Sequence, residues 1–162
     1  MKGEYSTAGD LRQPIVAVMG SGMDEHGELA GPLGEWIGAN GCHLLTGGGA
    51  GVMASVSRAF HSVEGRAGRS IGILPGSPGA GGRGSPGGYP NHWVEIPIRT
   101  HLPLSGERGR DPMSRNHLNV LSADVIVALP GGAGTRSEVE LALEYGRPLI
   151  CWLGEEGGIA GL

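Results

Sequence analysis

The side chains best suited to chemistry lie in and before one glycine-rich segment, residues 130–138, which reads Pro-Gly-Gly-Ala-Gly-Thr-Arg-Ser-Glu. At the start of a helix, the backbone N–H groups of such a turn bind phosphate without lysine, because they meet the positive end of the helix dipole. Glu138 then has two interpretations. With Thr135 it could form a capping box, in which the carboxylate only reaches back to the cap amide. Alternatively, in a glycine-lined phosphate pocket it could engage a ribose or a water molecule.

Arg115 is the second candidate. It falls in the first turn of a helix that Asp111 and Pro112 are expected to open, where a cation opposes the helix dipole. Helix stability therefore does not explain this arginine. It is either a solvated surface side chain or a partner for an anionic ligand, to which guanidinium offers two parallel hydrogen bonds. The neighbouring Asn116 could orient a polar ligand or be an ordinary exposed asparagine.

Three turns rich in glycine follow three expected strands, and parallel strands bring such turns to one edge of a sheet, where ligands bind. Together they indicate a phosphate or nucleotide site. The strict dinucleotide fingerprint, Gly-x-Gly-x-x-Gly with an acidic residue about 20 positions later, is absent. The candidate binding residues of these turns are Gly20, Ser21, Gly22, Gly47, Gly48, Gly49, Gly51, Gly131, Gly132, Gly134 and Thr135.

The elements that position these residues alternate along the chain. Short apolar runs predict strands, and helical spacing with Gly or Asn stops predicts helices between them. Continuous rather than alternating apolar runs are typical of a parallel sheet covered on both faces, so we expect an α/β fold, a Rossmann-like doubly wound sheet. The expected strands are residues 15–19, 42–46, 71–74, 93–96, 125–129 and 149–152, and the expected helices are 24–39, 52–64, 112–121 and 135–145.

We expect a single domain over residues 1–162, since this length buries enough surface for one core. Two segments are expected to be mobile. Residues 1–13 precede the first strand, and residues 75–92 consist mostly of Gly, Pro, Ser and Ala without apolar side chains until Tyr89.

Composition excludes several classes of function. The formal net charge is −4 and no cluster of Lys and Arg forms a positive stripe, so no nucleic-acid partner is expected. Lys2 is the only lysine, which rules out pyridoxal-phosphate chemistry and a Walker A loop. The start lacks the apolar stretch of a signal peptide and no run is long enough to span a bilayer, so no membrane partner is expected. With only two cysteines, Cys42 and Cys151, the chain is expected to be cytoplasmic.

The sequence gives little support for a metal site or a hydrolase triad. The six histidines show no metal-ligand spacing, so we predict no metal site. Ser21, Ser114 and Ser137 lack a nucleophile elbow and an accompanying His and Asp pattern, which argues against a hydrolase triad.

Residues 130–138 resemble the Pro-Gly-Gly-x-Gly-Thr-x-x-Glu motif of the Lonely Guy family of cytokinin-activating phosphoribohydrolases. Arg115 lies 23 positions before Glu138, the spacing at which that family carries its catalytic Arg and Glu, and residues 46–53 resemble its second glycine motif. The resemblance implies hydrolysis of the N-glycosidic bond of a purine nucleoside 5′-monophosphate, with no cofactor required. Arg115 and Glu138 would be catalytic, and the glycine turns, Asn116 and Thr135 would hold the nucleotide.

Two further segments are more similar to a sister branch, the molybdenum cofactor carrier proteins. They are residues 89–98, Tyr-Pro-Asn-His-Trp-Val-Glu-Ile-Pro-Ile, and residues 114–116, Ser-Arg-Asn. That cofactor is a pterin bearing a phosphate monoester. The alternative function is therefore a carrier that binds molybdenum cofactor, or a nucleotide, in the same site without catalysis. The resemblance also implies a homodimer with the helix of residues 135–145 near its interface.

Overall fold

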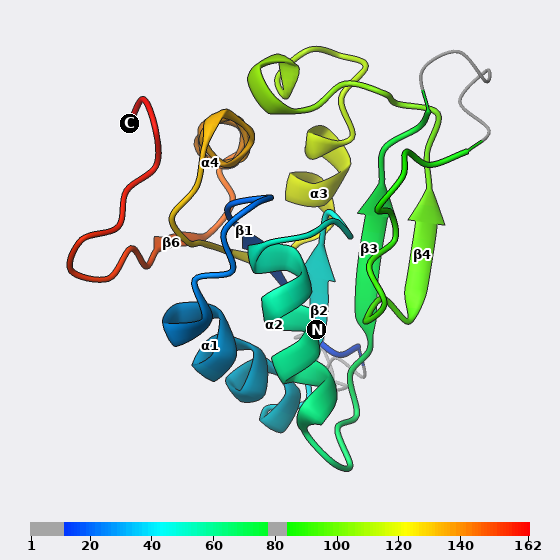
Figure 1. Cartoon of the computed structure of the whole chain (residues 1–162), viewed down its shortest axis with the longest axis vertical. Helices are drawn as coiled ribbons and strands as arrows, with labels where there is room; N and C mark the ends of the chain where they lie inside the picture. The colour runs from blue at the N-terminus through cyan, green and yellow to red at the C-terminus, as the bar shows by residue number, and fades with distance from the viewer. Residues whose placement is uncertain (1–11, 78–83) are drawn as a thin grey trace, which may run out of the picture.

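Six parallel strands form one sheet in the computed structural model, which describes residues 12–77 and 84–162 (Figure 1). The strand order is β4-β3-β2-β1-β5-β6. Starting from β1 near the middle, the chain winds outward first in one direction and then in the other. This confirms the expected doubly wound α/β fold. The strands are β1 Ile15–Met19, β2 His43–Thr46, β3 Ser70–Leu74, β4 Ile96–Arg99, β5 Val125–Ala128 and β6 Leu149–Cys151.

Helices cover both faces of the sheet. Alternate residues of β1 point to opposite faces, and their packing separates two apolar clusters. Val16 and Val18 pack with the apolar sides of α1 and α2, whereas Ala17 and Met19 pack with those of α3 and α4. The helices are α1 Gly27–Ala39, α2 Val52–Ser62, α3 Asn116–Ser122 and α4 Ala133–Glu144, and a short 3₁₀ helix, η1, covers Gly106–Arg108.

The register of the central strands brings the three glycine turns together. In β1, Val16 pairs with Leu44 of β2 on one side and with Val125 of β5 on the other, all in parallel. The carboxyl ends of these strands therefore meet at one edge. There the Ser21 N–H donates to the Pro130 carbonyl at 3.0 Å, and the Val52 N–H donates to the Ser21 carbonyl at 2.9 Å.

Two elements begin at later residues than the sequence predicted. The helix expected from residue 112 begins at Asn116, because the Asp111 carboxylate accepts from Arg108 at 2.8 Å instead of capping a helix, and residues 111–114 form a turn. The strand expected at 93–96 is β4, Ile96–Arg99. Residues 91–94 form a second turn, in which Asn91 accepts hydrogen bonds from the N–H groups of Trp93 and Val94.

The two segments expected to be mobile lie partly outside the described residues, which omit 1–11 and 78–83. The far end of the second segment is held. The Asn91 N–H donates to the Gly48 carbonyl and its side-chain amide donates to the Gly49 carbonyl, both at 2.7 Å. Asn91 is thereby fastened to the second glycine turn.

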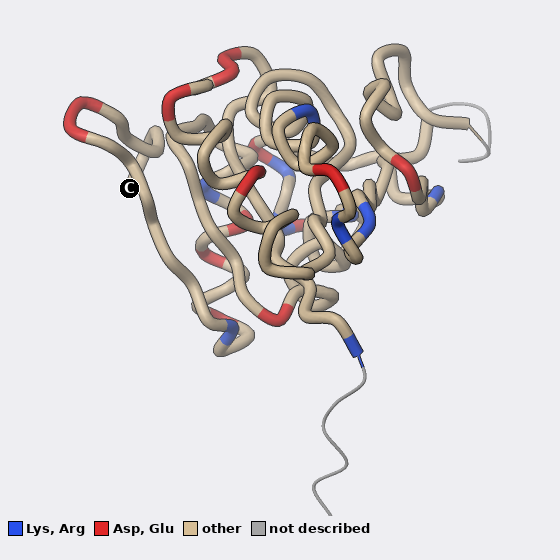
Figure 2. Tube along the Cα trace, turned by 90° about the horizontal axis from the view of Figure 1, so that it is seen from below, with Lys and Arg blue, Asp and Glu red and all other residues tan. Residues whose placement is uncertain are grey.

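Charged residues are distributed over the whole fold. Figure 2 shows Arg positions interspersed with Asp and Glu along the described chain. Within the same residues, no helix has the length and apolar character needed to cross a membrane.

One cluster of charged side chains fastens β4 to the segment before β3. Glu95 pairs with Arg66 at 2.9 Å and with Arg69 at 3.0 Å, and its second oxygen accepts the Ser70 N–H at 2.9 Å. Burial by itself would raise the pKa of Glu95. The Ser70 N–H and the two guanidinium groups outweigh burial and lower this pKa to about 2.

Replacing Glu95 by glutamine is therefore expected to lower the free energy of unfolding at pH 7 by about 1–3 kcal/mol. Because the folded-state pKa lies below the ordinary value, the stabilisation is complete above about pH 4.5 and is lost as the pH falls toward 2. Urea unfolding of both proteins at pH 7, 4 and 3 measures this difference. Glu64→Gln, at an exposed glutamate, serves as the control and is expected to change stability far less. A difference between parent and E95Q that widened on acidification would contradict the assignment.

Candidate functional site

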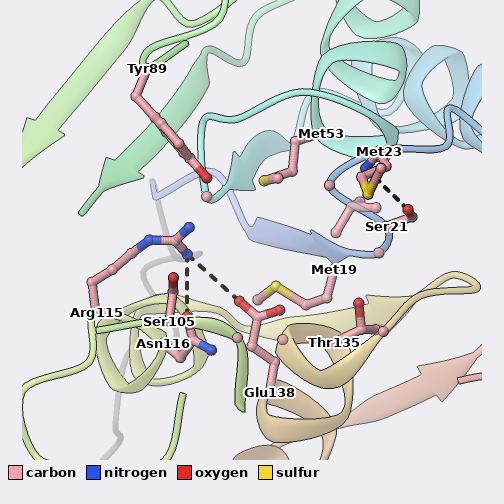
Figure 3. A pocket seen from close by; sticks show the side chains of 17 residues that line it. Met19, Ser21, Met23, Met53, Tyr89, Ser105, Arg115, Asn116, Thr135 and Glu138 are labelled. Atoms are coloured by element: carbon pink, nitrogen blue, oxygen red, sulfur yellow. Dashed lines mark hydrogen bonds and ion pairs between the residues drawn. The ribbon is translucent and has the colours of Figure 1, made fainter. Parts of the chain in front are cut away.

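A cavity of about 290 Å³ opens at the carboxyl edge of the sheet (Figure 3). Its walls come from both helical layers, since Met53 belongs to α2 whereas Glu138 belongs to α4. The cavity gathers most of the residues that the sequence indicated: Gly20, Ser21, Gly22, Gly47, Arg115, Asn116, Gly132, Gly134, Thr135 and Glu138.

The N-terminus of α4 forms one wall. Gly132 precedes the helix in an extended conformation, and no side chain caps the helix start. The first backbone N–H groups of a helix lack partners within it. Thr135, 2% exposed, also lines the cavity, and its hydroxyl has no hydrogen-bond partner in the described chain. This wall therefore offers several unused donors at the positive end of a helix dipole.

Arg115 enters from the residue before α3 and is only 5% exposed, so the interpretation as a solvated surface arginine is wrong. Its guanidinium packs against the bare Cα of Gly47, where an added Cβ would lie 2.5 Å from Nη2. The Nη1 atom of Arg115 lies 3.8 Å from Oε1 of Glu138 and 3.4 Å from Oδ1 of Asn116. The Nε atom has no partner among the described residues. The cation thus keeps unused hydrogen-bonding capacity beside the cavity.

Glu138 does not cap α4, so its capping-box interpretation is wrong. The helix begins at Ala133, which puts Thr135 inside it rather than at the cap. Instead, the Glu138 carboxylate accepts a hydrogen bond from Nδ2 of Asn119 at 3.0 Å. Burial raises the pKa of Glu138 above its ordinary value, and Arg115 and the Asn119 hydrogen bond oppose that rise. A buried carboxyl held by an amide and facing a cation can accept or hold a proton at the cavity wall.

Asn116 is 2% exposed, so it is not an ordinary surface asparagine. Its side-chain amide donates to the Ser137 hydroxyl at 2.9 Å, and its backbone N–H donates to the Ser114 hydroxyl at 3.1 Å. The bond to Ser137 joins the start of α3 to α4, and the Asn116 side chain also accepts from Arg115. Asn116 therefore has the geometry of a positioning residue.

The Ser21 hydroxyl faces its own turn rather than the cavity. It accepts the N–H groups of Met23 at 3.1 Å and Asp24 at 2.9 Å, which leaves its main chain to line the pocket. Gly48, Gly49, Gly51 and Gly131 do not line this cavity. Gly51 has a φ of +60°, and a Cβ there would lie 2.7 Å from the carbonyl carbon of Gly22, so it permits the close approach of two turns. 

Six lining residues were missed by sequence reasoning, apart from the core residue Val18: Met19, Met23, Met53, Tyr89, Ser105 and Gly106. Met19, Met23 and Met53 flank predicted glycine turns, so including the positions next to those turns would have identified them. The other three lie in long connections without periodicity, which carry no signal for a cavity wall. Within the described residues, no group of three or more His, Cys, Asp or Glu side chains is arranged to hold a metal ion.

This parallel α/β fold with a glycine-lined cavity at its carboxyl edge agrees with the sequence comparisons. The chain belongs to the SLOG cluster4 family, whose sequence model matches residues 13–158. No curated protein matches the sequence.

Several solved structures are similar to most of the chain, among them two named for molybdenum cofactor. The molybdenum cofactor binding protein of Rippkaea orientalis is 36% identical, with a TM-score of 0.67 over 90% of this chain and 79% of that one. The Moco carrier protein of Chlamydomonas reinhardtii is 34% identical, with a TM-score of 0.67 over 90% of this chain and 80% of that one.

Proposed function

We propose that this protein binds molybdenum cofactor as cargo in the cavity between the glycine turns. The observation that carries the proposal is the buried Thr135 hydroxyl without a partner, set at the N-terminus of α4. A phosphate monoester would supply acceptors for this hydroxyl and for the first helical N–H groups. Identity to two proteins named for molybdenum cofactor, 36% and 34%, supports the choice of cargo.

The residues present fit a phosphate-bearing pterin. Gly132 and Gly134 have no side chains to block the approach of a phosphate to the helix start, and no atom outside the chain neighbours lies closer than 3.7 Å to a Cβ added at either. Arg115 supplies a cation with an unused Nε donor. Phosphate recognition by backbone and guanidinium groups does not require a lysine, which agrees with the composition.

Cofactor retention tests this proposal. Molybdenum cofactor released anaerobically from a molybdoenzyme is mixed with the purified protein, and gel filtration followed by reconstitution of a cofactor-free enzyme measures what is retained. The protein is expected to retain the cofactor, and Thr135→Val to weaken binding about tenfold or more, because it removes a charge-assisted hydrogen bond. Thr100→Val makes the same change away from the cavity, at a hydroxyl that donates to Leu74, and should bind normally. Failure of the parent protein to retain cofactor would contradict the proposal.

Hydrolysis of a purine nucleoside 5′-monophosphate is the second candidate, favoured by the buried Arg115 and Glu138 side chains 3.8 Å apart at the cavity wall. In that reaction water adds to the ribose carbon as the C–N bond breaks and the base leaves with a proton. A carboxylate beside the sugar would stabilise the developing cation. Chromatography after incubation with AMP and an N6-modified AMP decides between the two. A hydrolase releases free base and loses about 10²- to 10⁴-fold in rate in Glu138→Gln. A carrier releases none.

We further propose a cytoplasmic homodimer in which α4 and β6 lie at the interface. Large apolar side chains are exposed there, including Leu143 at 68% and Ile150 at 55%. Their burial against a second copy would remove apolar surface from water. Light scattering at micromolar concentration tests the dimer, and a monomeric mass would contradict it.

A further inference from the structure

We propose that Tyr89 and Met53 form the wall against which the planar ring system of the ligand packs, so that they select heterocyclic phosphates over plain sugar phosphates. This inference rests on the proposed function, because it assumes a ligand whose phosphate lies at the start of α4. It concerns two residues that sequence reasoning did not assign to the site.

Tyr89 is fixed in place although it belongs to a long connection. Its N–H donates to the Pro86 carbonyl at 3.2 Å, and the Asn91 side chain and main chain bind the second glycine turn, as described above. In Figure 3 its ring projects from this connection into the cavity, on the far side from Thr135. The ring is therefore held before any ligand arrives, which lowers the entropic cost of binding.

Met53 and Tyr89 both lie over the bare Cα of Gly49. A Cβ added at Gly49 would lie 2.8 Å from the Met53 methyl carbon and 2.9 Å from both the ring edge and the hydroxyl of Tyr89. The Met53 sulfur accepts the Gly49 N–H at 3.4 Å, which holds the thioether at the cavity. Gly49 therefore lies behind Met53 and Tyr89 and, having no side chain, leaves room for both. This explains why a residue of the predicted motif does not itself line the cavity.

The chemistry of this wall differs from that of the opposite one. The α4 side presents N–H groups and a hydroxyl, whereas Tyr89 and Met53 present an aromatic ring and a polarisable thioether. An aromatic face stacks on flat heterocycles, and thioethers pack favourably against ring edges. A ligand that places its phosphate at α4 and spans the cavity would bring its ring to this wall. The class selected is a planar heterocycle of two or more fused rings joined to a phosphate monoester.

Two probes separate the ring from the phosphate: a pterin carrying a phosphate monoester on its 6-alkyl group, and ribose 5-phosphate. Calorimetry measures the affinity of each for the parent protein and for Tyr89→Leu, Tyr89→Phe and Met53→Ala. The parent should bind the pterin phosphate more tightly. Tyr89→Leu should weaken pterin binding about 10- to 100-fold, the usual range for loss of a stacking partner, while ribose 5-phosphate binding changes less than about twofold. Tyr89→Phe keeps the ring and should bind the pterin phosphate nearly as well as the parent.

Quenching of pterin fluorescence gives a second readout, because a merely structural role for Tyr89 would not alter it selectively. Quenching is expected with the parent and with Tyr89→Phe, and its loss with Tyr89→Leu at saturating ligand. Thermal unfolding checks that each variant folds. Equal affinity of the parent for both probes, or an unchanged pterin affinity in folded Tyr89→Leu and Met53→Ala, would overturn this inference alone. Failure of the parent to bind either probe would overturn the proposed site as well.

Discussion

Replacing Arg115 by methionine is expected to lower the free energy of unfolding by about 2–4 kcal/mol, because it leaves the carboxyl of Glu138 buried without its cation. Both side chains are less than a tenth exposed. Burial raises the pKa of Glu138, and Arg115 opposes this rise. Its loss should therefore raise the pKa of Glu138 further. Methionine keeps much of the apolar volume of the arginine stem, so the change reports mainly on charge. Urea unfolding at pH 7 measures the effect.

A second substitution separates charge from packing. In Arg115→Met with Glu138→Gln, no charge is left unpaired, and the Asn119 amide still has an oxygen to which it can donate. The double variant is therefore expected to be more stable than Arg115→Met alone. Arg110→Met is the matched control, since Arg110 is exposed and pairs with Glu140 and Glu144 at the surface, where ion pairs contribute little. An Arg115→Met protein as stable as the Arg110→Met protein would show that the buried pair has no structural role.

Two glycines of α1, three positions apart, are expected to respond very differently to alanine. At Gly34 an added Cβ would collide with the Val56 carbonyl oxygen and lie 2.9 Å from the Ala59 Cβ, so α1 and α2 would have to separate. We expect Gly34→Ala to lower the free energy of unfolding by about 2–4 kcal/mol, as overpacking against a backbone does. At Gly31 no atom outside its chain neighbours lies within 4 Å of an added Cβ. Gly31→Ala should change the free energy of unfolding by less than about 1 kcal/mol, because helix propensity favours alanine whereas the following Pro32 disfavours a side chain at this position.

Chemical unfolding of the two variants side by side measures this contrast. Both substitutions add the same methyl group to the same helix, so the difference between the two stabilities reports mainly on packing at Gly34. If both variants gained stability, the close crossing of α1 and α2 at Gly34 would be wrong.

Most of the fold could be predicted from the sequence because its signals are local. Apolar runs such as residues 15–19 and 125–129 mark buried parallel strands, and Gly or Asn marks the helix ends. The start of α3 could not be predicted in this way. Asp111 and Pro112 carry the usual signature of a helix start, but the carboxylate binds Arg108 instead, and this competing contact is not visible in the local pattern.

The candidate site was predictable where it depends on parallel strands. The three glycine turns follow β1, β2 and β5, which are neighbours in the sheet, so the turns had to meet. The role of Glu138 as a cap was equally consistent with the sequence, since Thr135 and Glu138 have capping-box spacing. Only the observed helix start at Ala133 excludes it. Tyr89 is in contact with Gly49 through the folding of a long connection, which residue spacing does not encode.

The cavity has a wall from each helical layer, with Met53 from one layer and Glu138 from the other. A ligand there contacts both sides of the sheet, so binding and global unfolding are thermodynamically linked. At a free concentration 100 times Kd, such a ligand adds about 2.7 kcal/mol to the free energy of unfolding. Because the contacts reach α2 and α4 together, slowed amide exchange should extend through both helices rather than stay at the turns. A protein of this design would be most resistant to unfolding and proteolysis while loaded, and its persistence would follow the supply of its ligand.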